Sequence, residues 1–203
     1  TTFSWPTESQ ETTHFSVVDA QRNAVSLTYT LEYGYGSRIV VPGGGFLLNN
    51  EMGDFNAGPG LTNEDGLIGT EPNLARPEQR MLSSMSPAIV ARDGELVAVV
   101  GSPGGRTIIN TVLQVILNLT TFGMDLPQAI AAPRIHHQWL PDRISAEEGL
   151  DPAVVAALEA MGHTVTSRGR QGLAHSIAVD PATGLLVGQP DARNEDAGAA
   201  AVR

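Results

Sequence analysis

The stretch Thr12-Thr13-His14-Phe15-Ser16-Val17-Val18-Asp19 decides the fold of this 203-residue chain. It predicts a β-strand over residues 15–18, with two hydroxyl residues at the head of the strand. A threonine at that place becomes a nucleophile if the peptide bond before it is cut, because its freed α-amine then serves as the base for its own hydroxyl. Eleven residues precede Thr12. The first hypothesis is therefore a cleavage directly before Thr12.

Composition excludes several classes of function. The chain has no cysteine, which excludes a disulfide scaffold, a zinc–thiolate site and a cysteine nucleophile. Its net charge of −10 argues against binding to nucleic acids or to anionic membrane surfaces. No apolar run reaches the roughly 18 residues of a membrane-spanning helix.

The adjacent His136 and His137 would point to opposite sides of an extended chain, so we expect no metal site there. We also expect no cofactor.

Hairpins and helices alternate along the chain. Alternating apolar residues and turn signals predict strands at residues 15–18, 24–30, 39–41, 88–91, 95–100, 163–166, 176–179 and 185–188. Apolar periodicity predicts a helix at about 106–121. A short helix at 126–132 is expected to stop at Pro133, and a third helix is expected to start at Asp151-Pro152 and end at Gly162. Several hairpins with helices between them indicate an α+β fold with antiparallel sheets packed in layers. The segment after Gln189 is expected to be an exposed tail.

The second expected strand carries different chemistry on its two faces. Val25, Leu27 and Tyr29 share one face, and Ser26, Thr28 and Thr30 share the other. The hydroxyl face either lines a site or meets solvent, and the sequence leaves both possibilities open.

Three further groups of polar residues are candidates for a site. Glu51 and Asp54 follow an apolar strand-like run, where carboxylates either line a site or lie in a hydrated loop. The neighbouring Ser83 and Ser84 either bind a carboxylate or cap a local turn. Gly104-Gly105 stands between a strand and a helix, where backbone N–H groups form an anion or oxyanion cradle unless the pair is only a tight turn.

These motifs together resemble the small, catalytic subunit of γ-glutamyltransferase, an N-terminal-nucleophile hydrolase. The matching stretches follow the order and similar spacing of that family. They are Thr12-Thr13-His14-Phe15-Ser16-Val17-Val18-Asp19, Thr28-Tyr29-Thr30, Leu47-Leu48-Asn49-Asn50-Glu51-Met52, Asp54-Phe55, Leu82-Ser83-Ser84-Met85-Ser86-Pro87, Gly101-Ser102-Pro103-Gly104-Gly105, Ala132-Pro133-Arg134 and His136-His137-Gln138-Trp139-Leu140-Pro141.

The resemblance implies a four-layer αββα sandwich, completed by a large subunit that is not in this chain. It implies a precursor that cleaves itself before Thr12 and remains together as a heterodimer. Residues 1–11 would then be the tail of the large subunit or a linker before the cleavage site, and residues 12–203 the small catalytic subunit. Members of the family are usually periplasmic or secreted, so the resemblance implies the same location for this protein.

The resemblance also assigns roles in the reaction. Thr12 matches the nucleophile, and Thr30 matches a threonine that assists processing. Gly104 and Gly105 match the oxyanion-hole glycines. The family positions that bind the substrate head group are Glu51 and Asp54 for the α-ammonium, and Ser83 and Ser84 for the α-carboxylate.

Two positions depart from the family pattern. Glu32 stands where many members have asparagine. Its carboxylate can still accept from the α-ammonium, so it remains a candidate substrate-binding residue, and it adds a negative charge that disfavours acidic groups nearby. Asp65 stands near the point where some members have a tyrosine that covers the pocket, which favours water as the acceptor.

The expected reaction is transfer of a γ-glutamyl group through an ester on Thr12, to water or to amino acids and peptides. A glutathione-like γ-glutamyl compound would be the donor. The alternatives are a cephalosporin or glutaryl acylase, an enzyme that cuts poly-γ-glutamate, and an unprocessed relative without catalytic activity.

Overall fold

The computed structural model of the protein describes residues 12–56, 58–64, 66 and 68–201. The expected tail 1–11 and the expected lid residue Asp65 lie outside the described residues. The strands are β1 (Thr13–Val18), β2 (Ala24–Tyr29), β3 (Ala88–Arg92), β4 (Glu95–Val100), β5 (Ile135–His136), β6 (Ile144–Ala146), β7 (Val165–Ser167), β8 (Ser176–Val179) and β9 (Leu186–Gln189). The helices are α1 (Ile108–Thr120), α2 (Leu126–Ala131) and α3 (Pro152–Ala160), with 3₁₀ turns η1 (Glu51–Asp54), η2 (Glu71–Asn73) and η3 (Gly105–Thr107). This confirms the α+β class.

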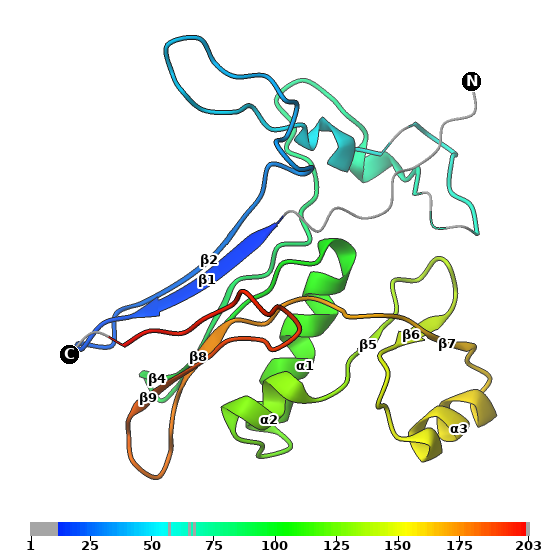
Figure 1. Cartoon of the computed structure of the whole chain (residues 1–203). Coiled ribbons are helices and arrows are strands. Elements are labelled where there is room, and N and C mark those ends of the chain that lie inside the picture. The colour runs from blue at the N-terminus through cyan, green and yellow to red at the C-terminus, as the bar shows by residue number, and fades with distance from the viewer. Residues whose placement is uncertain (1–11, 57, 65, 67, 202–203) are drawn as a thin grey trace.

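A four-stranded antiparallel sheet, in the order β3-β4-β8-β9, forms the centre of the molecule (Figure 1). The two expected hairpins supply its strands, and the pairing of Ala98 with Ala178 joins them. In the β3–β4 turn, Asp93 and Gly94 have φ angles of 53° and 86°. Positive φ at both central residues is what a two-residue hairpin turn with the native twist requires.

Helices α1 and α2 pack on one face of this sheet, and the main apolar core lies between them and the sheet (Figure 1). The core is made of Ala98, Val100, Ile108, Val112, Val115, Leu126, Ile130, Ala174 and Ala178. A capping box starts α2, because the Asp125 side chain accepts from the Gln128 N–H and the Gln128 side chain accepts from the Asp125 N–H. Asp151 caps α3 by accepting from Ala153 N–H at 2.8 Å.

The β1–β2 hairpin forms a second sheet layer that contacts β4 and β8 (Figure 1). Its hydroxyl face is turned inward: Ser26 Oγ donates to Val100 O at 3.0 Å, and Ser16 Oγ donates to His175 O at 3.0 Å. This settles the open question about the polar side of β2, which does not face solvent. The opposite side, which we call the outer hairpin face, is apolar and 37–58% exposed, and consists of Phe15, Val17, Val25, Leu27 and Tyr29.

The described chain therefore contributes three layers, which are helices, central sheet and hairpin sheet. A soluble protein rarely leaves a contiguous apolar face of this kind open to water. The outer hairpin face is where the fourth layer of an αββα sandwich would pack.

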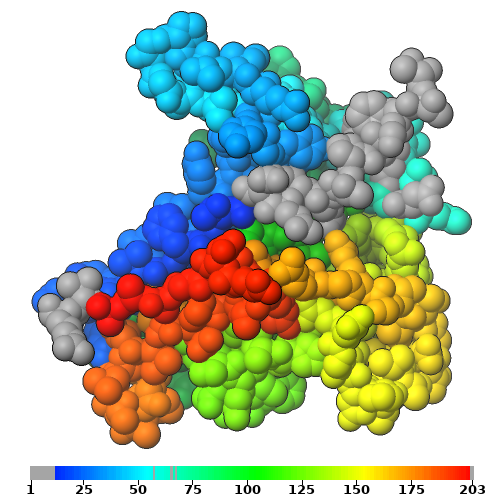
Figure 2. Space-filling view, viewed as in Figure 1, coloured from blue at the N-terminus to red at the C-terminus, as the bar shows by residue number. Residues whose placement is uncertain are grey.

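Other parts differ from the sequence-based expectation. The third sheet, β5-β6-β7, contains one parallel pair, β6 with β7, so the sheets are not all antiparallel. The expected strand at 39–41 is reduced to a single bridge between Val40 and Leu47. This bridge lies in the segment between β2 and η1, which projects from the body of the molecule (Figures 1 and 2). Among the described residues, no helix combines the length and the apolar character needed to cross a membrane.

Candidate active site

Thr12 stands directly before β1 and is partly buried. The register of the hairpin pairs Thr13 with Tyr29, so one further step brings Thr12 opposite Thr30. The Thr30 Oγ1 accepts a hydrogen bond from Glu32 N–H at 2.9 Å. The expected nucleophile and the expected processing threonine thus lie at the same end of the hairpin.

The glycine turn, Gly104 and Gly105, lies at the exit of β4 just before α1. Both residues have positive φ, 134° and 56°, a region that L side chains rarely adopt. A Cβ on Gly104 would lie 2.7 Å from Thr107 Oγ1 and 3.0 Å from Gly172 Cα, so no larger residue fits. The turn therefore brings bare backbone to the start of a helix, where N–H groups favour negative charge.

The hairpin and the glycine turn meet through a close approach at Gly101. A Cβ on Gly101 would lie 2.0 Å from His14 Cε1, so the His14 ring packs directly against this backbone. His14 is two residues after Thr12, and Gly101 is three residues before Gly104. This contact brings the head of β1 and the glycine turn to the same side of the molecule, as the start of β1 and the N-terminal end of α1 in Figure 1 indicate.

The serine pair lies beside the glycine turn. Ser84 Oγ donates to Gly105 O at 2.8 Å. Ser83 is exposed, and its Oγ accepts from Met85 N–H at 3.2 Å. Ser84 is thus hydrogen-bonded to the glycine turn, and Ser83 is its neighbour in the chain without a direct bond to that turn among the described contacts.

Three carboxylates, Glu32, Glu51 and Asp54, form what we call the acid cluster. Glu51 and Asp54 belong to η1, and Glu51 is only 9% exposed. Two hydrogen bonds hold the segment around Glu32 against η1: Asn50 N–H donates to Leu31 O at 3.2 Å, and Tyr33 N–H donates to Asn50 Oδ1 at 3.1 Å.

The carboxyls of the acid cluster all have raised pKa values. Burial is the first cause for each of them. The charge of Asp54 further raises the pKa of Glu32 and of Glu51, and Glu51 adds to the effect on Glu32. Arg106, next to the glycine turn, opposes the rise at Asp54. The cluster therefore has an excess of negative charge that a cation would relieve.

Asn73 is a site residue that the sequence did not reveal. It is 9% exposed, donates from Nδ2 to Asp54 O at 2.7 Å, and accepts at Oδ1 from Leu82 N–H at 2.9 Å. One side chain thus ties the acid cluster to the serine pair. It comes from the segment 56–80, which is rich in Gly, Pro and Asn, and a single asparagine in such a segment carries no periodic signal.

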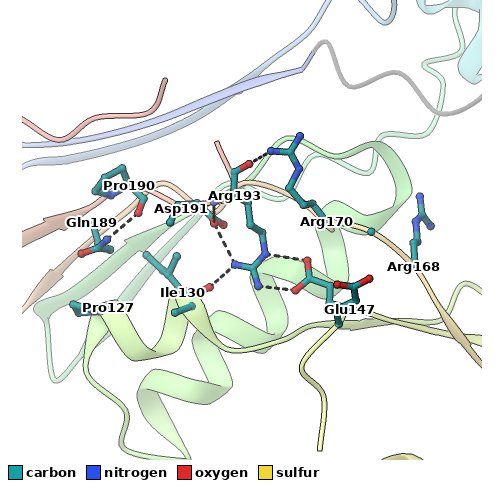
Figure 3. Close-up of a pocket in the computed structure, with 13 residues that line it drawn as sticks. Pro127, Ile130, Glu147, Arg168, Arg170, Gln189, Pro190, Asp191 and Arg193 are labelled. Atoms are coloured by element: carbon teal, nitrogen blue, oxygen red, sulfur yellow. Dashed lines mark hydrogen bonds and ion pairs between the residues drawn. The ribbon is translucent and has the colours of Figure 1, made fainter. Parts of the chain in front are cut away.

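A second polar cluster lies away from these residues, beside a pocket of about 490 Å³ (Figure 3). Arg134 pairs with Asp191 at 2.7 Å, and Arg193 pairs with Glu147 at 2.6 Å and with Asp191 at 3.1 Å. We call these four residues the buried charge network. Asp191 is fully buried, so the expectation of an exposed tail after Gln189 is wrong for the first part of the segment, whereas residues 195, 196 and 198–201 are exposed. The error arises because charged residues are usually exposed unless they are paired.

His136 and His137 lie on different sides of the chain, as expected, with His136 buried and His137 exposed. Within the described ranges, no group of three His, Asp or Glu side chains is arranged to hold a metal ion.

Comparison with known proteins identifies the family of this chain. The family model for gamma-glutamyltranspeptidase matches residues 2–201. The chain belongs to the gamma-glutamyltranspeptidase family. It is 48% identical to the glutathione hydrolase proenzyme of Escherichia coli strain K12 over 191 residues, which are 94% of this chain and 33% of that protein. The Pseudomonas aeruginosa proenzyme is 50% identical over 177 residues, 85% of this chain and 32% of that protein.

Solved structures of gamma-glutamyltranspeptidases have the same fold. A mutant of the Helicobacter pylori enzyme matches with a TM-score of 0.81 and 45% identity, over 90% of this chain and 100% of that chain. A cephalosporin acylase from Bacillus halodurans matches at 24% identity and a TM-score of 0.73, over 89% of this chain and 32% of that chain, and shows the fold alone. The chain spans about a third of the length of the curated relatives that it matches.

Proposed function

We propose that residues 12–203 are the small catalytic subunit of a γ-glutamyltransferase of the glutathione hydrolase type, with Thr12 as the nucleophile. The observation that carries the proposal is the packing of His14 against Gly101, because it brings the head of β1 beside the glycine turn. A nucleophile and an oxyanion cradle must meet at one carbonyl, and this contact joins the two segments that hold them.

The reaction starts with cleavage of the bond before Thr12, which frees its α-amine. The amine takes the proton of Thr12 Oγ as the oxygen attacks the γ-carbonyl carbon of the donor. Negative charge develops on the carbonyl oxygen, where the N–H groups of Gly104 and Gly105 are the proposed donors. The C–N bond then breaks, the leaving amine takes the proton, and a γ-glutamyl ester remains on Thr12. Water or an acceptor amine attacks this ester and restores the free hydroxyl.

The head group of the donor fits the chemistry of the surrounding residues. A γ-glutamyl group ends in an ammonium and a carboxylate at its α-carbon. The acid cluster supplies negative charge for the ammonium. The hydroxyls of Ser83 and Ser84 suit the carboxylate, and Ser84 turns its proton from Gly105 O to the substrate when the donor binds. Fixing this head aims the γ-carbonyl at Thr12, which is the positioning part of catalysis.

The proposed partner is the large subunit of the same precursor. The outer hairpin face is apolar and open, in the place of the fourth layer of the sandwich. The projecting segment between β2 and η1 is also apolar at its surface, since Tyr35, Val40 and Phe46 are 57–73% exposed. Surfaces of this kind mark protein interfaces. Family membership further supports a periplasmic or secreted location and the assignment of residues 1–11 to the tail of the large subunit.

Thr12→Ala in the full precursor tests the proposal. We expect the wild-type protein to give a chain that starts at Thr12 by intact mass, and to release p-nitroaniline from γ-glutamyl-p-nitroanilide. The variant should fold with an unchanged circular dichroism spectrum, remain uncut and show no turnover. If the variant still cuts itself, Thr12 is not the nucleophile. A wild-type chain that stays uncut and inactive supports the unprocessed, non-catalytic relative instead.

Turnover of matched anilides separates the remaining alternatives. The γ-glutamyl anilide carries the ammonium that the acid cluster would bind, and the glutaryl anilide lacks it. We expect kcat/KM to favour the γ-glutamyl compound by roughly tenfold or more, the value of one hydrogen-bonded charge. A preference for the glutaryl compound would identify an acylase. Release of glutamate oligomers from poly-γ-glutamate, with no turnover of either anilide, would identify the third alternative.

A further inference from the structure

His14 is a buried residue to which the proposed reaction gives no role. It lies on the inward face of β1, is 4% exposed, and stands between the exposed Thr13 and Phe15. Its Nδ1 lies 2.9 Å from Thr28 Oγ1, and its Nε2 lies 3.2 Å from Ser16 Oγ. Both ring nitrogens thus have hydroxyl partners inside the protein.

The hydrogen-bond directions follow from the partners of Ser16. Ser16 Oγ uses its only proton to donate to His175 O at 3.0 Å, so it accepts from His14 Nε2–H. Nδ1 is then the unprotonated nitrogen of a neutral ring, and it accepts from the hydroxyl of Thr28. This assignment uses both ring nitrogens of His14 and the hydroxyl protons of Ser16 and Thr28.

The ring is also in tight contact with β4. A Cβ on Gly101 would lie 2.0 Å from Cε1, 2.4 Å from Nδ1 and 2.5 Å from Nε2 of His14. Only a glycine leaves room for the imidazole at this point. The ring therefore fills the space between the hairpin sheet and the end of β4.

These contacts join the three segments that carry the proposed chemistry. His14 lies two residues after Thr12 on β1. Its partner Thr28 lies two residues before Thr30 on β2. Gly101, at the end of β4, lies three residues before Gly104. Each segment is thus held by the same imidazole within two or three residues of its proposed catalytic group.

We propose that His14 is a positioning residue, whose neutral imidazole fixes the head of β1 relative to Thr30 and to the glycine turn. This rests on the proposed function of Thr12. The role needs the uncharged ring, because in the charged ring Nδ1 would also carry a proton, and the Thr28 hydroxyl could no longer donate to it. Burial and the neighbouring His175 lower the pKa of His14 to about 4, so the ring is neutral at neutral pH. The segments of β2 and β4 that touch the ring present Thr28 and Gly101, which carry no charge.

The test compares two buried histidines in the full precursor. His136 is also 4% exposed, and its ring nitrogens lie 3.0 Å from Asn110 Nδ2 and 2.8 Å from Gln138 Oε1, but it belongs to β5. His14→Gln and His136→Gln therefore remove equally buried and equally bonded rings. The readouts are the rate of self-cleavage by intact mass, and kcat and KM for γ-glutamyl-p-nitroanilide per mole of cut, folded protein.

We expect His14→Gln to slow self-cleavage and to lower kcat by roughly ten- to a hundredfold, the range of a misplaced reacting group, with KM changed less than about twofold. His136→Gln should leave both parameters near wild type. Equal kcat in the two variants would overturn the proposal, since it would mean that the ring serves only stability. If wild type itself shows no turnover, the proposed function fails, and not the positioning role alone.

A milder variant covers the case in which His14→Gln does not fold. Thr28→Val keeps the shape of the side chain and the imidazole, and removes only the hydroxyl that donates to Nδ1. We expect a smaller fall in kcat, of roughly three- to tenfold, with KM unchanged. A wild-type kcat for Thr28→Val would contradict the role of this contact and overturn the proposal.

Discussion

The chain holds two clusters of carboxylates out of bulk water, and it treats them in opposite ways. In the buried charge network, Asp191 and Glu147 are paired with Arg134 and Arg193 at 2.6–3.1 Å. In the acid cluster, Glu32, Glu51 and Asp54 repel one another, and Arg106 acts only on Asp54. In the buried charge network the two arginines neutralise the two carboxylates, whereas the acid cluster keeps an excess of negative charge.

The pKa shifts express this difference. Burial works to raise the pKa of Asp191, but Arg134 and the N–H donors of Ala174 and Arg193 outweigh it, so its pKa is lowered. Among the described residues, no comparable set of donors acts on the acid cluster, and its pKa values stay raised. A satisfied network holds a fold together, whereas an unsatisfied one is suited to binding a cation that arrives from outside. The ammonium of the proposed donor is such a cation.

The largest expected effect comes from breaking the paired cluster. Arg134→Met keeps most of the side-chain volume but removes the more buried of the two arginines that pair with Asp191, and only Arg193 remains. We expect a loss of about 3–5 kcal/mol in the free energy of unfolding, measured by denaturant titration of the assembled protein. Arg76→Met is the control, because the Arg76–Glu71 pair has side chains that are 52% and 79% exposed. That pair should contribute about 0–1 kcal/mol. Equal losses in the two variants would show that the contribution of an ion pair to stability does not depend on its burial in this protein.

The next effect concerns the unpaired cluster and falls on catalysis. Asp54→Asn should lower kcat/KM for γ-glutamyl-p-nitroanilide by about 1.5–3 kcal/mol, or roughly ten- to a hundredfold, because a charged hydrogen bond to the ammonium is lost. Stability should not fall, since the removed charge has no buried ion-pair partner in the part of the chain that the structure describes. Asp93→Asn makes the same chemical change at the exposed β3–β4 turn and should leave kcat/KM unchanged. A loss of stability without a change in kcat/KM would remove Asp54 from the proposed binding site.

The sequence predicted the hairpins because their signals are local. Alternation and turn signals predicted β3 and β4. The stop at Pro133 predicted the end of α2, and the start at Asp151-Pro152 with the end at Gly162 predicted α3 within one or two residues. Strands β5 and β6 have two and three residues, too few to show a period, and they were missed. The parallel pairing of β6 with β7 likewise depends on the rest of the fold.

The site was predictable as a set of residues but not as an arrangement. The motifs that resemble those of the family identified Thr12, the acid cluster, the serine pair and the glycine turn as candidates. The roles of these residues remain predictions. The links between these groups come from His14 and Asn73, and their partners are distant in sequence. The Arg134–Asp191 pair, 57 residues apart, was missed for the same reason. Long-range polar pairs leave no periodic pattern, so only the folded chain reveals them.

The smallest expected effect is on stability at Glu32, where two substitutions distinguish the contribution of the charge from that of the backbone conformation. Glu32 has a φ of 75°, which a glutamate adopts at some cost and an asparagine tolerates better. Glu32→Gln removes only the charge, whereas Glu32→Asn also suits the backbone. The folded-state pKa of Glu32 is raised, so its contribution to stability is present below the ordinary glutamate pKa of about 4.3 and is lost as the pH rises through the raised value.

Glu32→Gln should therefore stabilise the protein at neutral pH by at most about 1 kcal/mol, because the side chain is partly screened by solvent, and should have no effect below about pH 4. Glu32→Asn should add a further gain that does not depend on pH. Denaturant titrations of Glu32→Gln and Glu32→Asn between pH 4 and pH 8 measure the charge effect and the backbone effect separately. Asp191 has the opposite pH dependence, because its lowered pKa means that its contribution to stability is lost as the pH falls.

The Glu32 variants also bear on catalysis. Since repulsion between carboxylates is mutual, both variants should also move the acid limb of kcat/KM to lower pH. An acid limb that does not move would show that Glu32 is not coupled to the other two acids.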